Sequence, residues 1–390
     1  MRKSAVSFAA LCLLATGAGL GTVQAAKDEV VVGGTLALSG RFSGDVKTFK
    51  TLMDNYAAMV NERGGIKIGG KARKLRFKIY DDNSNPGKAR QLYERLITVD
   101  KVDLLIGPYS SPITFGASGV AEKHKVPFVA VEANATALYK RNFKWLLGVL
   151  ASGELWSRNY FDMLKAEGKA KTVAFITQDH LHAKDVYNGA VKYAKKVGFN
   201  VVFDEVASPK ITDFTSAITK MKAAKPDVIH ISSFQPFAVT FVKQAVAQGL
   251  KPLEFHAIHH GKGFSSGVGP LGNKVTGEAY WMPGMTIGDV KFFAELLKRS
   301  GFTVGEYPWS AIRVPAMDVI VDALKRAGTL DRNKVIAALR ATDIVTIGGR
   351  ILFAANGSGT MNTIVTQIRG GKYHLVWPKG PGYPTTKHEY

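Results

Sequence analysis

The sequence is almost free of cysteine, since Cys12 is the only one among 390 residues. This excludes a disulfide framework and a zinc site built on thiolates. Acidic residues are also scarce: 31 Asp and Glu stand against 52 Lys and Arg, for a formal net charge of +21. Hydrophobic residues make up 46%, which excludes a disordered chain. At roughly 150 residues per domain, the length predicts two domains.

Several motifs of nucleotide and ester chemistry are missing. The sequence has no Gly-x-x-x-x-Gly-Lys-Ser/Thr loop, no Gly-x-Gly-x-x-Gly after the first expected strand and no Gly-x-Ser-x-Gly elbow. A secreted α/β enzyme stays open as an alternative, but it requires a nucleophile or a perturbed acid–base pair in its cleft. We find no such constellation, and we predict neither an enzyme nor a cofactor.

The N-terminus predicts a cleavable export signal. Arg2 and Lys3 precede an apolar stretch without charge over 5–22, and Val23 and Ala25 supply the small residues before a cleavage site. We expect cleavage after Ala25, which removes residues 1–25 as a signal peptide and lowers the charge from +21 to +19. No later segment is long and apolar enough to span a bilayer, so we expect the mature protein in the periplasm.

The positive charge does not favour nucleic acid as a partner. The Lys and Arg residues are scattered, and their densest run, between Lys67 and Lys78, flanks a Gly-Gly turn and an expected strand. No nucleic-acid recognition motif accompanies it. A basic field that steers small anions or an anionic surface is the better interpretation.

Strands and helices alternate along most of the chain, which predicts an α/β fold with parallel sheets. Expected strands cover 30–38, 75–81, 102–106, 127–131, 172–177, 201–206, 227–232 and 255–258. Expected helices cover 46–61, 87–99, 112–124, 185–197, 214–223, 237–248, 290–299, 308–327 and 332–339. A break over 143–156, where we expect no strand–helix unit, favours two doubly wound lobes over a single eight-unit barrel. A hairpin over 363–376 turns at Gly370-Gly371, and the tail from Gly277 is expected to complete both lobes.

Six of the nine histidines fall between residues 180 and 260, around the ends of expected strands. They are His180, His182, His230, His256, His259 and His260. Imidazoles are good ligands for transition metals, so a metal receptor is one alternative. The spacing lacks a helical His-Glu-x-x-His frame, and we predict no metal site: one or two of these rings line a pocket and the others are satisfied locally.

Four motifs, in order, carry a resemblance to a known family. They are Gly34-Thr35-Leu36-Ala37-Leu38-Ser39-Gly40, Asn61-Glu62-Arg63-Gly64-Gly65-Ile66, Asp81-Asp82-Asn83-Ser84-Asn85-Pro86 and Ile106-Gly107-Pro108-Tyr109-Ser110-Ser111. Together they resemble the leucine/isoleucine/valine-binding family of extracytoplasmic solute receptors for ABC transporters, over residues 30–376.

The resemblance implies two doubly wound parallel-sheet lobes joined by a three-strand hinge, with a ligand cleft between them. Lobe 1 would comprise 27–147 and 282–354, and lobe 2 would comprise 148–281 and 355–390. The implied function is capture of a small carboxylate-bearing solute by lobe closure and delivery to an ABC permease by a monomeric receptor. A receptor for a membrane signalling protein is the alternative, because it would use the same cleft.

In lobe 1 the resemblance implies a carboxylate site at the ends of the strands, where helix N-termini also lie. Ser110 and Ser111 open a helix, and the Ser111 hydroxyl can bind the carboxylate or simply cap the helix. The other candidates are in neighbouring loops: Ala133, Asn134, Ala135 and Thr136 offer backbone groups and a hydroxyl, and Ser39, Arg41 and Phe42 flank the entrance.

In lobe 2 the chain departs from relatives that bind aliphatic amino acids. His182 replaces a customary Tyr, Phe234 keeps an aromatic, and His259 and His260 stand where an acid would meet the ligand's ammonium. Tyr109, Trp156 and Phe234 are candidate cavity walls. Loss of the acid favours a carboxylate without an amine, such as an aromatic acid, with Asp179 and Asp185 as fallback ammonium partners.

Overall fold

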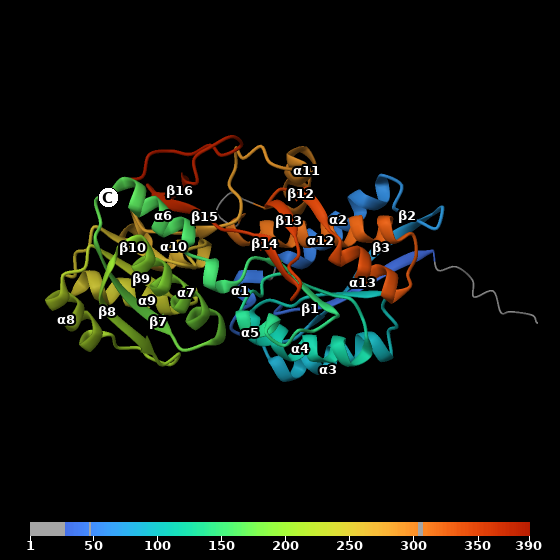
Figure 1. Cartoon of the computed structure of the whole chain (residues 1–390), viewed down its shortest axis with the longest axis horizontal. Coiled ribbons are helices and arrows are strands. Elements are labelled where there is room, and N and C mark those ends of the chain that lie inside the picture. The colour runs from blue at the N-terminus through green and yellow to red at the C-terminus, as the bar shows by residue number, and fades with distance from the viewer. Residues whose placement is uncertain (1–27, 47, 303–306) are drawn as a thin grey trace, which may run out of the picture.

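The computed structural model describes residues 28–46, 48–302 and 307–390, so the expected signal peptide over 1–25 lies outside the described residues. The described chain forms two lobes that lie side by side (Figure 1). Each lobe contains a seven-stranded sheet with helices on both faces, and a separate two-stranded sheet adds to the first lobe. The predicted α/β class with two lobes is therefore confirmed.

The sheet of lobe 1 is parallel except at β2, which pairs antiparallel with β3. Its strands, in spatial order, are β14 (Ser358–Met361), β6 (Leu146–Leu150), β5 (Phe128–Ala130), β4 (Leu104–Ile106), β1 (Glu29–Leu36), β3 (Lys71–Asp81) and β2 (Ile66–Ile68). The central strands β4, β5 and β6 are buried along their whole length. They are short apolar runs because helices cover both of their faces.

The helices of lobe 1 cover the two faces of this sheet in separate groups. They are α1 (Ser43–Val46), α2 (Phe49–Glu62), α3 (Pro86–Thr98), α4 (Ser111–His124), α5 (Thr136–Tyr139), α11 (Val290–Ser300), α12 (Tyr307–Ala327) and α13 (Arg332–Arg340). One core joins α3 and α4 to the sheet, and the larger core joins α2, α11, α12 and α13 to its other face. The pair β12 (Asp343–Thr346) and β13 (Gly349–Leu352) follows α13.

The sheet of lobe 2 is parallel through five strands and ends in an antiparallel hairpin. Its strands, in spatial order, are β16 (Lys372–Trp377), β15 (Ile364–Arg369), β11 (Thr276–Ala279), β10 (Glu254–Ala257), β9 (Val228–Ser232), β7 (Thr172–Gln178) and β8 (Asn200–Ala207). The expected hairpin with its turn at Gly370-Gly371 is thus β15–β16, at the edge of this sheet.

The helices of lobe 2 are again divided between the two faces. They are α6 (Arg158–Glu167), α7 (Leu181–Val197), α8 (Thr215–Ala224), α9 (Gln235–Ala247) and α10 (Lys262–Val268), with 3₁₀ turns η1 (Gly153–Leu155) and η2 (Gly269–Gly272). α6 and α7 share one core with the sheet, while α8, α9 and α10 share another.

The chain passes between the lobes three times: after β6, after β11 and between β14 and β15. β6 continues to Leu150, and β14 pairs with it through Ser358 and Met361. The chain therefore leaves the sheet of lobe 1 after Leu150 and again after Met361, a few residues later than the expected divisions at 147/148 and 354/355.

The segment 143–156, where we expected no strand–helix unit, contains the strand β6, which was not among the expected strands. Its five residues are all buried, between β5 and β14. Periodicity cannot separate so short an apolar run from a buried turn or helix end. What makes this segment a strand is the pairing on both of its edges.

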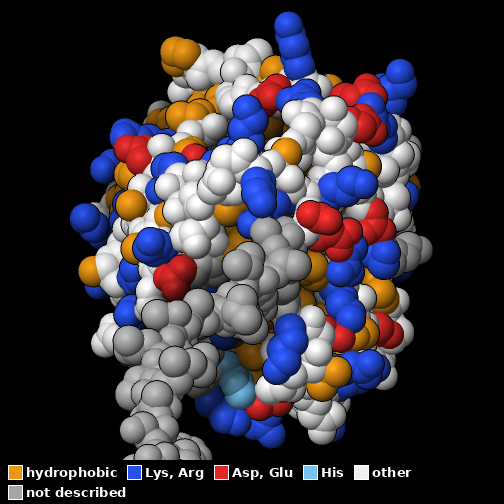
Figure 2. All heavy atoms as spheres, turned by 90° about the vertical axis from the view of Figure 1, so that its right-hand side faces the viewer, with side chains coloured by type: hydrophobic (Ala, Val, Ile, Leu, Met, Phe, Trp, Pro, Cys, Tyr) orange, Lys and Arg blue, Asp and Glu red, His pale blue; other side chains and the backbone are white. Residues whose placement is uncertain are grey.

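Basic residues are dispersed over the end of lobe 1 that lies away from lobe 2 (Figure 2). On the far end of lobe 1, Lys and Arg side chains lie singly among acidic and uncharged ones, without a continuous basic patch (Figure 2). In the part of the chain that the structure describes, no helix is both long and apolar enough to cross a bilayer.

Candidate functional site

A small cavity lies between the two lobes. It is lined by loops at the carboxyl ends of strands in both sheets, which is where open α/β sheets bind ligands. Lobe 1 contributes Tyr109, Ser110, Ser111, Glu132, Asn134, Leu150 and Ile312; lobe 2 contributes Trp156, His182, Phe234 and His259.

The lobe 1 wall offers hydrogen-bond donors at the start of α4. Ser110 has φ +84°, which is rare for a residue other than glycine and signals local backbone strain. Its hydroxyl and the amide nitrogen of the Asn134 side chain are buried without a hydrogen-bond partner among the described residues. Buried donors of this kind are costly unless a ligand or water satisfies them.

Ser111 connects two of these loops rather than capping its own helix. Its Oγ accepts hydrogen bonds from the backbone amides of Asn134 and Ala135, both at 3.2 Å. The N-cap position of α4 is Ser110, and it makes no side-chain cap. The two loops that carry the unpartnered donors are therefore held in contact by one hydroxyl.

His182 joins the lobes and contacts a second histidine. Its Nδ1 lies 2.9 Å from Oδ1 of Asn134 in lobe 1, and its Nε2 lies 3.2 Å from Nε2 of His259. Burial lowers the pKa of His182 to about 3 and lowers that of His259 well below its ordinary value, with His182 adding to the shift. Both rings are therefore neutral, so His182 donates to Asn134 and accepts from His259.

Aromatic rings form the remaining walls. Trp156 meets His182 edge to face with ring centroids 4.8 Å apart. Phe42 does not line the cavity but packs behind it, with its ring centroid 5.3 Å from that of Tyr109 and 5.0 Å from that of Phe234. The walls of the cavity thus offer ring faces and edges on which a flat apolar group can pack.

Glu132 and Arg313 form a buried ion pair that the sequence did not indicate. Arg313, from α12, is fully buried; its Nε lies 3.2 Å from Glu132, its Nη2 is in closer contact with the same carboxylate, and its Nη1 donates to the Gly107 carbonyl. Burial raises the pKa of Glu132 to about 7, and Arg313 opposes that rise. Glu132 lines the cavity, but its charge is compensated.

The other predicted residues lie around the cavity without lining it. Ala133 and Ala135 are buried beside Asn134, and Thr136 contacts Asp185. Ser39 donates to Asp81, and exposed Arg41 lies over the ring of Phe42. His260 bonds Thr366 inside lobe 2 at 2.6 Å.

Three lining residues were missed: Glu132, Leu150 and Ile312. Glu132 stands only two residues before Asn134, so its place in the same strand-end loop was a usable signal. Leu150 and Ile312 belong to β6 and to the long α12, and nothing in an apolar residue distinguishes a cavity wall from a core position.

Comparison with known proteins gives the family. The sequence profile described as "Periplasmic binding protein" matches residues 29–372, nearly the whole described chain. The chain belongs to the periplasmic binding protein family. It is a binding protein similar to Leu/Ile/Val-binding proteins, and not an enzyme.

Among its relatives is the Leu/Ile/Val-binding protein homolog 7 of Brucella abortus, 25% identical over 82% of this chain and 84% of that protein. Homolog 8 of the same species is 25% identical over 89% of each chain. Solved structures of similar fold include the substrate binding protein LivJ of Streptococcus pneumoniae in complex with isoleucine, with a TM-score of 0.77, 20% identity and coverage of 90% of this chain and 100% of that one. An ABC-transporter solute binding protein of R. palustris in complex with 4-hydroxybenzoate has a TM-score of 0.77, 21% identity and coverage of 91% and 98%.

Proposed function

We propose that this periplasmic binding protein captures a carboxylate without an amine, of the aromatic acid class, by closing its lobes around it. After removal of residues 1–25 it works in the periplasm as a monomer and hands the ligand to an ABC permease in the inner membrane. It needs no cofactor.

The observation that carries the proposal is the pair of unpartnered donors in a cavity walled by rings. The Ser110 hydroxyl and the Asn134 amide are both buried at the lobe 1 wall. A ligand carboxylate would accept from them and complete their hydrogen bonding, and charge-assisted bonds of this type are the strong ones. The aromatic walls Tyr109, Trp156 and Phe234 suit a flat ring beyond the carboxylate.

The acids near the cavity are already engaged, which argues against an ammonium group on the ligand. Asp185 accepts two hydrogen bonds from Thr136, and Asp179 forms an exposed ion pair with Lys184 at 2.7 Å. Glu132, the one carboxylate lining the cavity among the described residues, is paired with Arg313. An amine would enter a cavity whose lobe 2 wall consists of neutral imidazoles and aromatic rings.

Similar folds are known with both ligand classes. Solute binding proteins of R. palustris have been solved with 4-hydroxybenzoate and with benzoate, whereas LivJ of Streptococcus pneumoniae was solved with isoleucine. The fold therefore accommodates either class, and the choice for this chain rests on its own cavity residues.

The experiment is a paired thermal-shift and calorimetry test on mature protein freed of bound ligand by unfolding and refolding. Benzoate, 4-hydroxybenzoate and 3-phenylpropanoate are compared with phenylalanine, leucine and benzamide. A ligand at about 100 times its Kd adds about 2.7 kcal/mol of stability. We expect stabilisation by an amine-free acid but not by benzamide or the amino acids. Stabilisation by leucine or phenylalanine alone would overturn the proposal.

The variant Asn134→Ala should weaken binding of the stabilising acid about tenfold, because it removes one of the carboxylate's donors. Asn55→Ala is the matched control, since Asn55 bonds Ser300 on the far side of lobe 1. Equal affinity in both variants would remove Asn134 from the site.

A further inference from the structure

Three side chains of the kinds that bind metal ions lie on one face of the lobe 2 sheet, outside the cavity between the lobes. His230, His256 and Glu278 come from β9, β10 and β11, which are neighbouring strands, and all three are fully buried. His256 pairs in register with both His230 and Thr276, and Glu278 follows Thr276 by two residues on the same face. One ring nitrogen of each histidine and one Glu278 oxygen all lie within 4.8 Å of one another.

The hydrogen bonds around His256 point its free lone pair at Glu278. Thr276 donates its only hydroxyl proton to Glu254, with Oγ1 2.7 Å from Oε1, so it must accept from Nδ1 of His256 at 2.9 Å. The ring of His256 therefore carries a proton on Nδ1. Its Nε2, which has no hydrogen bond among the described residues, faces Oε2 of Glu278 at 2.9 Å, while Ser157 and Trp156 are hydrogen-bond partners of the Glu278 carboxylate.

Two acceptors this close repel each other unless something positive lies between or beside them. His230 also has a ring nitrogen without a hydrogen bond among the described residues. Ser157 donates to Oε1 of Glu278 at 2.7 Å, so it accepts from Nε2 of His230 at 2.9 Å. That leaves Nδ1 of His230 as a buried lone pair with no partner among the described residues.

We propose that His230, His256 and Glu278 bind a divalent transition-metal ion, zinc by the nature of the ligands, inside lobe 2. Two imidazoles and one carboxylate form a recurrent zinc ligand set. Zinc holds such atoms at about 2.0–2.2 Å, which places the ligand atoms of a tetrahedral site about 3.4 Å apart. The ligand atoms of the present cluster lie within 4.8 Å of one another, so binding would draw the three side chains closer together, with a water as fourth ligand.

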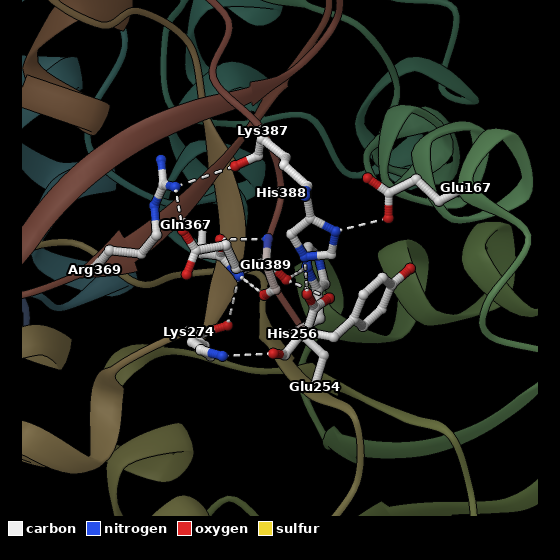
Figure 3. Close-up of polar contacts among 11 residues, drawn as sticks. Glu167, Glu254, His256, Lys274, Gln367, Arg369, Lys387, His388 and Glu389 are labelled. Carbon is white, nitrogen blue, oxygen red and sulfur yellow. Dashed lines mark hydrogen bonds and ion pairs between the residues drawn. The ribbon is translucent and has the colours of Figure 1, made fainter.

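The cluster also has the outer support that metal-binding histidines usually have. His256 is oriented through Thr276 by the carboxylate of Glu254, and Glu254 is held in turn by His388 of the C-terminal segment. Figure 3 shows His388 between Glu254 and Glu167, with the ring of His256 behind. Partners of this kind fix the tautomer and the direction of the ligating nitrogen.

The site is structural rather than part of ligand capture, since its residues are closed off from solvent by α6. The ring of Tyr160 stacks on that of His256 at 3.6 Å. Ser157 follows Trp156 of the cavity wall, so the ion would brace the segment that carries Trp156. A fully buried site fills as the chain folds, and metal must therefore be supplied during refolding.

The test uses untagged mature protein, unfolded with chelator and refolded with a slight excess of Zn²⁺ or Co²⁺, then desalted. We expect close to one zinc per chain by mass spectrometry, visible ligand-field absorption with Co²⁺, and an X-ray absorption spectrum with two imidazoles and one carboxylate. Glu278→Gln keeps the shape of the side chain and should lower the affinity for the metal ion at least tenfold. His374→Gln on the edge strand β16 and His259→Gln in the ligand cavity should keep it.

Each outcome decides the proposal. Wild-type protein that retains less than a tenth of an equivalent overturns it, and a proton shared between Glu278 and His256 then occupies the place of the metal. Metal retained by Glu278→Gln but lost by His259→Gln moves the site to the ligand cavity and also overturns the proposal. If Glu278→Gln does not fold, the X-ray absorption spectrum of the wild type decides instead. A spectrum without two imidazoles and one carboxylate around the metal would overturn the proposal. None of these results bears on capture of a carboxylate.

Discussion

Asp185 of lobe 2 accepts hydrogen bonds from both the backbone amide and the hydroxyl of Thr136 in lobe 1, each at 2.8 Å. Thr136 opens α5, and its hydroxyl also lies 2.7 Å from that of Ser152 on the first crossing segment. A carboxylate at a helix N-terminus is a favourable pairing. Because the partners belong to different lobes, the contact stabilises the closed arrangement.

Asp185→Ala should weaken ligand binding by about 10- to 100-fold, because hydrogen bonds to a charged group contribute about 1.5–3 kcal/mol and these contribute only to closure. Titration calorimetry with the stabilising carboxylate measures the change. The control is Asp179→Ala, which removes an exposed ion pair from the same region and should alter affinity less than about threefold. Wild-type affinity in Asp185→Ala would mean that the contact does not contribute to closure.

Ligand affinity should fall as pH drops below about 6.5. In the closed form burial lowers the pKa of His182 to about 3, whereas a solvated imidazole in open lobes titrates near 6.5. The open form therefore binds protons that the closed form excludes, and each histidine can cost up to about tenfold in affinity per pH unit. Dissociation constants at pH 5 to 8 should be flat above about 7, and His182→Gln should reduce the slope. An affinity that is constant from pH 5 to 7 would contradict this linkage.

Arg313→Met should destabilise the protein by about 3–5 kcal/mol, since it leaves the buried carboxylate of Glu132 without its counter-charge. Urea unfolding measures the loss. Adding Glu132→Gln should recover most of it, because the uncompensated charge is gone. Arg350→Met breaks an exposed pair with Asp343 and should cost less than about 1 kcal/mol. If Arg313→Met alone is as stable as the double variant with Glu132→Gln, the Glu132 carboxylate is not a buried charge in solution.

Stability should decrease between about pH 6.5 and 9 through His388. Burial lowers the pKa of His388, but its hydrogen bonds and charge contacts with Glu167 and Glu254 outweigh this and raise it to about 9 (Figure 3). A raised pKa stabilises the fold fully below the unfolded value of about 6.5, and this contribution is lost as pH rises through 9. Urea unfolding at pH 6 and 9.5 should differ by on the order of 2–3 kcal/mol, and His388→Asn should remove most of the difference. Equal pH dependence in the variant would assign the loss to other groups.

Much of the architecture could be predicted from local pattern. The alternation of apolar strands and amphipathic helices indicated two α/β lobes, and the resemblance to the solute-receptor family indicated eight of the cavity residues, among them Ser111, Asn134 and His182. These inferences succeed because ligand loops follow strands directly in the chain. β6 was missed because a short strand buried on both faces carries no periodicity of its own.

Which side chains far apart in the sequence come into contact is determined by the tertiary structure alone. Arg313 reaches Glu132 across 181 residues, and six clustered histidines separate into a cavity group containing His182 and His259 and a core group containing His230 and His256. The physical reason is strand order: β9, β10 and β11 lie side by side, and helices from the end of the chain return to lobe 1. Residue type and spacing determined which chemistry the chain carries, and sheet topology determined which of those groups meet.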